Sequence, residues 1–194
     1  MDPKIKIFRN ILISSAFFAS SVSAHTFGAH GAGFAEGMAH PFIGLDHLLA
    51  MIAVGLWATQ LGGRALWGVP LAFVSVMVGG TVLANQGFEL AFVEAMIAIS
   101  VVILGLMVAG SVRVSTGISV LTVSVFALFH GYAHGLEMPQ AGSPLAYMGG
   151  FILATTTLHL VGIAMGLSLK TLQGVSWLSG TAIAVAGVYL LASL

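Results

Sequence analysis

The sequence predicts an all-α membrane protein, a compact bundle of six transmembrane helices that follows a cleavable signal peptide. Of the 194 residues, 58% are hydrophobic and only 6% are charged, which leaves too little charged surface for a soluble domain of this size. From residue 41 onward, apolar runs alternate with short polar turns. Each run has about the 20 residues that a helix needs to cross a bilayer.

The N-terminus has the three parts of a secretory signal. A basic stretch over residues 4–9 precedes an apolar run over 11–19, and small residues lead up to Ala24. We therefore predict that residues 1–24 are removed and that 25–194 form a single transmembrane domain. The alternative is an uncleaved first span, although the run is short compared with the roughly 20 residues that a bilayer requires.

The six predicted spans are separated by turns rich in glycine and polar residues. Glycine pairs four residues apart would let the helices approach closely inside the bundle; they are Gly33/Gly37, Gly131/Gly135 and Gly162/Gly166. In chain order, the spans cover residues 41–61, 65–84, 90–110, 114–133, 146–168 and 175–193.

Charge is distributed unevenly between the turns. If both ends of the mature chain lie outside the cytoplasm, every basic residue of the mature chain falls on the cytoplasmic side, as the positive-inside rule requires: Arg64, Arg113 and Lys170. The carboxylates then gather at or near the outer side: Glu36, Asp46, Glu89, Glu94 and Glu137. An acidic outer face would attract cations, or it simply follows from the retention of basic residues inside.

Composition also excludes some classes of function. The formal net charge is zero, and no cluster of Lys and Arg suggests a nucleic-acid partner. The chain has no cysteine, which excludes disulfides, thiolate metal sites and cysteine nucleophiles.

The first group of residues with distinctive chemistry is His40, Asp46 and His47. Ionisable groups inside a span are costly and usually mark an ion or substrate path, and imidazole with carboxylate suits Ni, Co, Zn or Fe(II). Pro41 fits the first helical position, so we expect His40 just before the helix. In a straight helix His40 and His47 would be separated by roughly 10 Å of rise. Either the Pro-Gly segment bends to form one site, or His40 is a separate ligand at the entrance.

The second group is His130, His134 and Glu137. Histidines four residues apart lie on one helix face, a spacing that suits metal chelation but is about equally typical of a structural pair. The fourth span should end on the side at which the first begins. We therefore expect the two groups to converge.

Other candidate ligands are more isolated. His25 would combine its imidazole with a free α-amine after cleavage, with His30 and Glu36 nearby in sequence. His159 lies near the middle of the fifth span beside three threonines, where it either hydrogen-bonds a neighbouring helix or acts as an inner relay site. Glu94 is expected to face the polar centre of the bundle rather than to extend outward.

Two stretches resemble the motifs of a known family. His40 to Met51, continuing to Ala58, resembles the H-x5-D-H motif of the HupE/UreJ family of hydrogenase and urease accessory proteins. Phe129 to Glu137 is similar to its F-H-G-x-A-H-G-x-E motif. The resemblance implies a permease of the bacterial cytoplasmic (inner) membrane that carries nickel, or cobalt in some members, to metalloenzymes. It implies as ligands His40, Asp46, His47, His130, His134 and Glu137.

We therefore expect a permease and not an enzyme, with a divalent metal ion as substrate rather than as prosthetic cofactor. Nickel is favoured, and cobalt and zinc stay open. The expected partners are the ion and the lipid bilayer, and a homo-oligomer or metalloenzyme accessory proteins are further candidates. Because histidine binds metal only when neutral, transport should weaken below about pH 6, as imidazoles protonate near their usual pKa of about 6.5.

Two alternatives remain. An intramembrane zinc hydrolase could use the same ligands with an open position for water, but it lacks an obvious buried acid for proton transfer other than Glu94. The second alternative is a metal receptor or scaffold that does not transport the metal.

Overall fold

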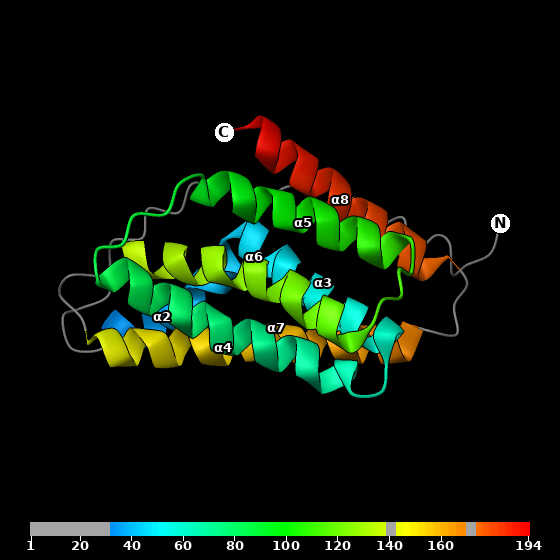
Figure 1. The fold of residues 1–194 in the computed structure, drawn as a ribbon, viewed down its shortest axis with the longest axis horizontal. Helices are drawn as coiled ribbons and strands as arrows, with labels where there is room; N and C mark the ends of the chain where they lie inside the picture. Colours follow the sequence, from blue (N-terminus) through cyan, green and yellow to red (C-terminus); the bar gives the residue numbers. More distant parts are fainter. Residues whose placement is uncertain (1–31, 139–142, 170–173) are drawn as a thin grey trace.

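The computed structural model describes residues 32–138, 143–169 and 174–194. The predicted signal peptide, His25 and His30 lie outside these residues. Within them every regular element is an α-helix (Figure 1): α2 (Ala32–Ile43), α3 (Leu45–Leu61), α4 (Ala65–Asn85), α5 (Val93–Ala109), α6 (Thr116–Leu136), α7 (Pro144–Leu169) and α8 (Val175–Ala192).

The helices identify a multi-pass membrane protein. Four of them, α4, α6, α7 and α8, are long and apolar enough to cross a membrane. The pair α2–α3 meets the same test as one broken span. The remaining helix, α5, is apolar but has only 17 residues.

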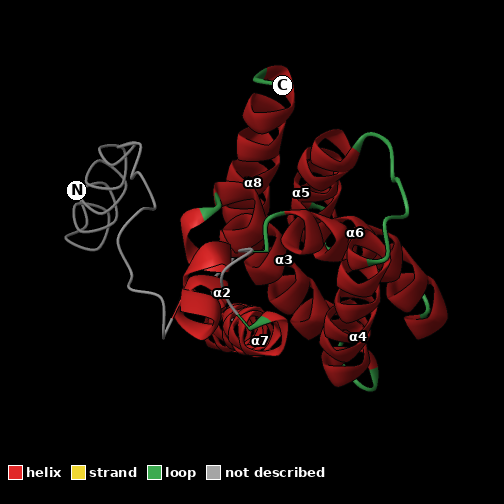
Figure 2. Cartoon of the chain, turned by 90° about the vertical axis from the view of Figure 1, so that its left-hand side faces the viewer, coloured by secondary structure: helices red, strands yellow, loops and turns green. Residues whose placement is uncertain are grey.

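Helix α3 lies at the centre of the bundle (Figure 2) and contacts each of the other six helices. Between Ala50 and Ala58 all its residues except Ile52 are buried. A helix that is apolar on every face is stable only in such surroundings. Near its C-terminus, Trp57 Nε1 donates to Val112 O (2.8 Å) and Gln60 Nε2 donates to Val108 O (2.9 Å). These two bonds fix α3 against the end of α5.

Glycines allow the closest helix contacts, as the sequence predicted. Gly131 of α6 lies directly on the backbone of Met77 in α4, and Gly37 of α2 lies on that of Tyr147 in α7. Gly162 of α7 packs on α3 in the same way. The glycine pairs thus serve packing inside the bundle.

The start of the first span differs from the prediction. His40 does not precede the helix, because α2 already begins at Ala32 and includes both His40 and Pro41 in its last turns. Proline has no N–H to donate, but its φ suits a helix, so α2 continues to Ile43. The chain then breaks at Gly44, whose extended backbone (φ −71°, ψ 111°) turns α3 away from α2 by 77°.

The two ends of the bundle differ in chemistry. The histidine end, at the left of Figure 1, contains the α2–α3 break, the α4–α5 turn and the C-terminus of α6. The arginine end, at the right, contains the α3–α4 and α5–α6 connections. These connections include Arg64 and Arg113. Glu94 was expected to face the bundle centre, and this was wrong: it is exposed in the first turn of α5.

Candidate metal centre

Three imidazoles from two parts of the chain meet at the histidine end. The bend at Gly44 brings the ring centroids of His40 and His47 to 5.3 Å from each other. The last turn of α6 places the ring of His134 4.8 Å from each of them. One ligand atom from each histidine lies within 4.8 Å of the others. The structure therefore has the bent arrangement, in which His40 and His47 belong to a single cluster. We call His40, His47 and His134 the three-histidine cluster.

A carboxylate orients His47. Asp46 Oδ1 accepts a hydrogen bond from the His47 backbone N–H (2.7 Å) and lies 2.8 Å from His47 Nδ1. A carboxylate can only accept, so the proton of the neutral ring is on Nδ1 and the lone pair is on Nε2. Such outer carboxylates fix the tautomer of metal-binding histidines and raise their basicity.

A second carboxylate holds His40. Glu137 follows the last residue of α6, and its Oε2 lies 2.8 Å from His40 Nε2, with both side chains partly exposed. Burial alone would raise the pKa of the Glu137 carboxyl, but the hydrogen bond from His40 and the charge of its ring outweigh burial and lower this pKa below its usual 4.5. Glu137 therefore stays ionised at the rim of the cluster.

Several buried ring nitrogens find no hydrogen-bond partner within residues 32–138, 143–169 and 174–194, and we call these the open nitrogens. They are His47 Nε2, His130 Nε2, and both nitrogens of His134 and of His159. Leaving a buried polar atom unpaired costs about 1–3 kcal/mol. Coordination of a metal ion would satisfy those at the cluster, and imidazole nitrogen suits Ni, Co, Zn and Fe(II).

The rings of α6 are held by packing. His134 is fully buried and stacks on Phe151 of α7, with centroids 4.5 Å apart and planes 8° from parallel. His130 Nδ1 lies 3.0 Å from Phe126 O, so it donates there and leaves Nε2 with the lone pair. The His130 ring is 4.9 Å from that of His47, which places it directly beside the cluster.

Comparison with known proteins gives the family. Residues 13–190 match the sequence profile described as HupE / UreJ protein. The chain belongs to the HupE/UreJ family. It is 47% identical over 175 residues to Protein HupE of Rhizobium leguminosarum bv. viciae, covering 89% of this chain and 91% of that protein. No solved structure matches the chain. The two stretches on which the resemblance to the HupE/UreJ family was based are the two that meet in the three-histidine cluster.

The predicted site residues of this HupE/UreJ protein take different positions. Asp46 and Glu137 are hydrogen-bonded to cluster histidines instead of adding their own oxygens to the group of ligand atoms. Glu36 lies one turn before His40 in α2 and has a buried Oε2 with no partner in the described part of the chain. His159 is buried in α7 and is not part of the three-histidine cluster; its ring contacts Phe73, whose ring also contacts His130.

Two aromatic residues were missed by the sequence analysis. Phe151 stacks on His134, and Phe73 contacts the rings of both His130 and His159. In an apolar span, nothing in the sequence distinguishes such residues from ordinary core positions.

Proposed function

We propose that this HupE/UreJ protein is a permease for a divalent transition metal, with nickel as the first candidate and cobalt or zinc as alternatives. The observation that carries the proposal is the convergence of three imidazoles from α2, α3 and α6, with open nitrogens on His47 and His134. Metal is the substrate in this proposal and not a cofactor of an enzyme. It would supply metalloenzymes, directly or through accessory proteins.

The proposed ligands divide into three roles. His40, His47 and His134 hold the ion, and His130 receives it or completes its coordination. Asp46 and Glu137 orient His47 and His40 and offset the charge of the dication. His40 and Glu137 are the partly exposed members, so the ion would reach them first and lose its water as it moves to His47 and His134.

The proposed topology has six spans, with the α2–α3 pair as one and α5 as the shortest. Residues 1–24 are cleaved, 25–194 form one transmembrane domain, and both ends of that domain lie outside the cytoplasm of a bacterium. The positions of Arg64 and Arg113 at the arginine end support this orientation. The three-histidine cluster would then face the outer side of the cytoplasmic membrane, whose acidic residues attract cations.

A hydrolase is less well supported. Hydrolysis by a bound zinc ion would need a further buried acid for proton transfer, and Glu94, the residue that the sequence analysis considered for this role, is exposed.

The test is metal uptake by purified protein in lipid vesicles that contain a metal-sensing dye. We expect saturable nickel uptake by the wild type and its loss in His47→Ala and Asp46→Ala at equal protein content. Ser75→Ala, whose hydroxyl bonds only within α4 in the described structure, is the control and should transport normally. Unchanged uptake in both site variants would remove the proposal. Flux in the absence of any partner protein excludes a scaffold that does not transport.

A further inference from the structure

The cavity between α4 and α7 is lined almost entirely by apolar side chains. It has a volume of about 270 Å³, slightly below the roughly 300–1,000 Å³ of pockets for drug-sized molecules. Thr156 and His159 are its two polar lining residues, and the Thr156 hydroxyl donates to Ile152 O within α7. The cavity therefore suits an apolar ligand about as large as one substituted ring. The apolar lining comes from both helices: Trp67, Pro70, Leu71, Val74, Leu160 and Ile163.

The cavity opens toward the outer surface of the bundle. Its two helices are both long and apolar enough to cross a membrane. Three of the lining side chains, Trp67, Leu71 and Leu160, are 59%, 68% and 48% exposed. Exposed apolar side chains on membrane-spanning helices are in contact with lipid. A ligand would therefore enter this cavity from the bilayer and not from water.

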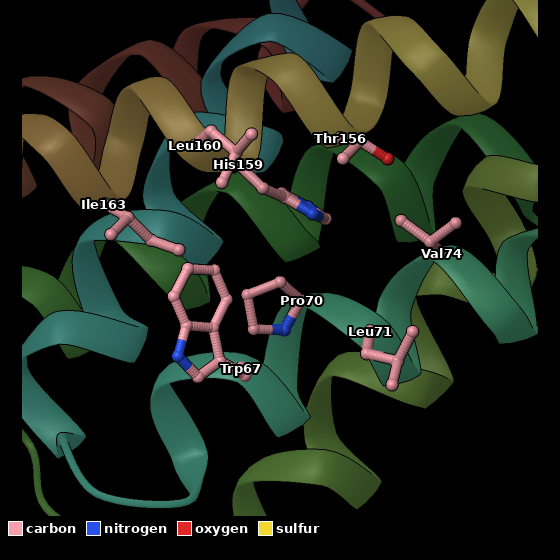
Figure 3. A pocket seen from close by; sticks show the side chains of 8 residues that line it. All are labelled: Trp67, Pro70, Leu71, Val74, Thr156, His159, Leu160 and Ile163. Atoms are coloured by element: carbon pink, nitrogen blue, oxygen red, sulfur yellow. The ribbon is translucent and has the colours of Figure 1, made fainter.

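His159 is the exception in this lining. It is 2% exposed, and neither ring nitrogen has a hydrogen-bond partner within the described residues. Figure 3 shows the ring directed from α7 into the cavity, opposite Pro70. The Phe73 ring lies edge-on against it, with centroids 5.3 Å apart. Hydrocarbon cannot satisfy these two open nitrogens, and a buried polar atom without a partner costs about 1–3 kcal/mol. The cavity therefore favours a ligand that brings its own polar atom.

The depth of His159 narrows the class of ligand. His159 lies ten positions before the last residue of α7, which corresponds to roughly 15 Å along the helix, or about half the thickness of a hydrocarbon core. A phospholipid keeps its oxygens in the polar region outside that core, so only its acyl chains would reach this depth. A neutral imidazole has one N–H donor and one acceptor nitrogen, which match an uncharged carbonyl or hydroxyl group.

We propose that this cavity binds a membrane-soluble quinone, with the quinone ring inside the cavity and the apolar tail in the bilayer. The N–H of His159 donates to a carbonyl oxygen of the quinone, and the other nitrogen accepts from a hydroxyl of the reduced form. Trp67 and Pro70 pack against the ring. A quinone satisfies the open nitrogens, whereas an acyl chain leaves both unpaired. His159 is not part of the three-histidine cluster, so the inference does not depend on the permease function.

Two substitutions of His159 separate hydrogen bonding from shape. His159→Leu removes both nitrogens and keeps the cavity apolar, so the fold should be as stable or more so. His159→Gln keeps a donor and an acceptor. We expect quinone affinity to fall about tenfold or more in His159→Leu and to stay close to that of the wild type in His159→Gln. Thr157→Val, whose hydroxyl is bonded inside α7, is the control and should match the wild type.

The experiment uses the full chain in nanodiscs of synthetic phospholipid that contain no quinone, and the probe is an azido derivative of a decyl benzoquinone. After illumination, mass spectrometry of the peptides locates the attached label. We expect the label on the stretches that line the cavity, residues 67–74 of α4 and 156–163 of α7, and its displacement by excess decyl benzoquinone. Thermal unfolding of each variant shows whether the fold is retained, and labelling of the wild type tests the site without any variant.

Three results would overturn the inference. Label spread evenly over the lipid-facing helices, α8 included, would leave phospholipid acyl chains as the occupant of the cavity, and so would label that excess decyl benzoquinone does not displace. Equal labelling of the wild type and folded His159→Leu would show that the imidazole does not contribute to binding. None of these results bears on metal uptake, which the vesicle assay tests separately.

Discussion

At the scale of single residues, the site depends on which nitrogen of each imidazole carries the proton. His47 donates a hydrogen bond from its Nδ1–H to Asp46, and Glu137 lies at hydrogen-bond distance from Nε2 of His40. Each carboxylate therefore determines which nitrogen its histidine offers to a metal. In the proposed site, the two carboxylates would thus orient the cluster for a cation without touching the ion.

The first prediction concerns Asp46→Asn. The amide keeps the shape and one acceptor oxygen but has no charge, so His47 would be less basic and less firmly oriented. We expect nickel affinity to fall about 10–100-fold, the usual effect of losing such an outer carboxylate. Equilibrium dialysis of the purified variant measures this, with Glu89→Gln in the exposed α4–α5 turn as control. Wild-type affinity in Asp46→Asn would show that the charge does not matter.

The second prediction concerns the pH at which Glu137 titrates. Its pKa lies below 4.5 in the folded protein because the hydrogen bond and charge of His40 outweigh the effect of burial. The stabilising effect of the pair is thus complete above the ordinary pKa and is lost as pH falls through the lower, folded value. In His40→Ala only burial and more distant charges remain, so the pKa of Glu137 should rise. Carbon-13 NMR of the carboxyl measures both midpoints, and an unchanged midpoint would contradict the pairing.

At the scale of elements, the break between α2 and α3 creates the cluster. A straight helix would separate His40 and His47 by roughly 10 Å, whereas the 77° bend at Gly44 brings their ring centroids to 5.3 Å. Broken helices in membrane proteins commonly form binding sites for this reason. The bend and the site therefore cannot be altered independently.

The third prediction tests this dependence with Gly44→Ala. The backbone of Gly44 suits alanine, but the added Cβ would lie 3.0 Å from Asp46 Oδ1 and 3.4 Å from His47 Nδ1. These atoms must shift by a few tenths of an ångström. We expect nickel affinity to fall about tenfold, or ~1.4 kcal/mol, with little change in thermal stability. Gly68→Ala in α4, where no described atom lies within 4 Å of the new Cβ, is the control. Equal affinities in the two variants would count against a cluster set by the bend.

The fourth prediction uses two glycines of α6. At Gly131 an added Cβ would overlap the backbone of Met77, whereas at Gly117 it would meet nothing within 4 Å in the described structure. Gly131→Ala should lower the free energy of unfolding by about 1–3 kcal/mol and weaken nickel binding through His130 and His134. Gly117→Ala should raise stability by up to about 1 kcal/mol. Unfolding in detergent followed by circular dichroism compares the two, and similar effects would contradict the close α4–α6 contact.

Part of the fold and of the candidate site could be predicted from the sequence alone. Apolar runs located α4 and α6 closely, because the length of a span is set by the bilayer, and the spacing of His130 and His134 placed them on one helix face. The sequence analysis missed α2, because Pro41 was interpreted as a helix start although it also fits a last turn. It could not determine that His134, rather than His130, joins the cluster. That depends on how α6 is rotated, which the contact between Gly131 and Met77 fixes over a long distance in the chain.

At the scale of the whole molecule, the two ends of the bundle differ in chemistry. The three-histidine cluster lies at one end, and Arg64 and Arg113 lie at the other. Helix α3 crosses the centre and contacts every other described helix, so a change at the histidine end can be transmitted to all of them. Transport from the histidine end to the arginine end would lead an ion toward Arg64 and Arg113. In the proposed direction of transport, these two positive charges would lie on the release side.

The fifth prediction concerns the orientation of the bundle in the membrane, which the proposed direction of transport requires. The chain contains no cysteine, so a single introduced thiol reports one position without background. Gln86 is exposed at the end of α4, on the histidine end, and Thr116 is exposed at the start of α6, on the arginine end. In spheroplasts, a membrane-impermeant maleimide should label Gln86→Cys directly and Thr116→Cys only after lysis. This follows because Arg64 and Arg113 should keep the arginine end in the cytoplasm. The reverse labelling pattern would place the three-histidine cluster on the cytoplasmic side, and the proposed uptake would then have to be replaced by export.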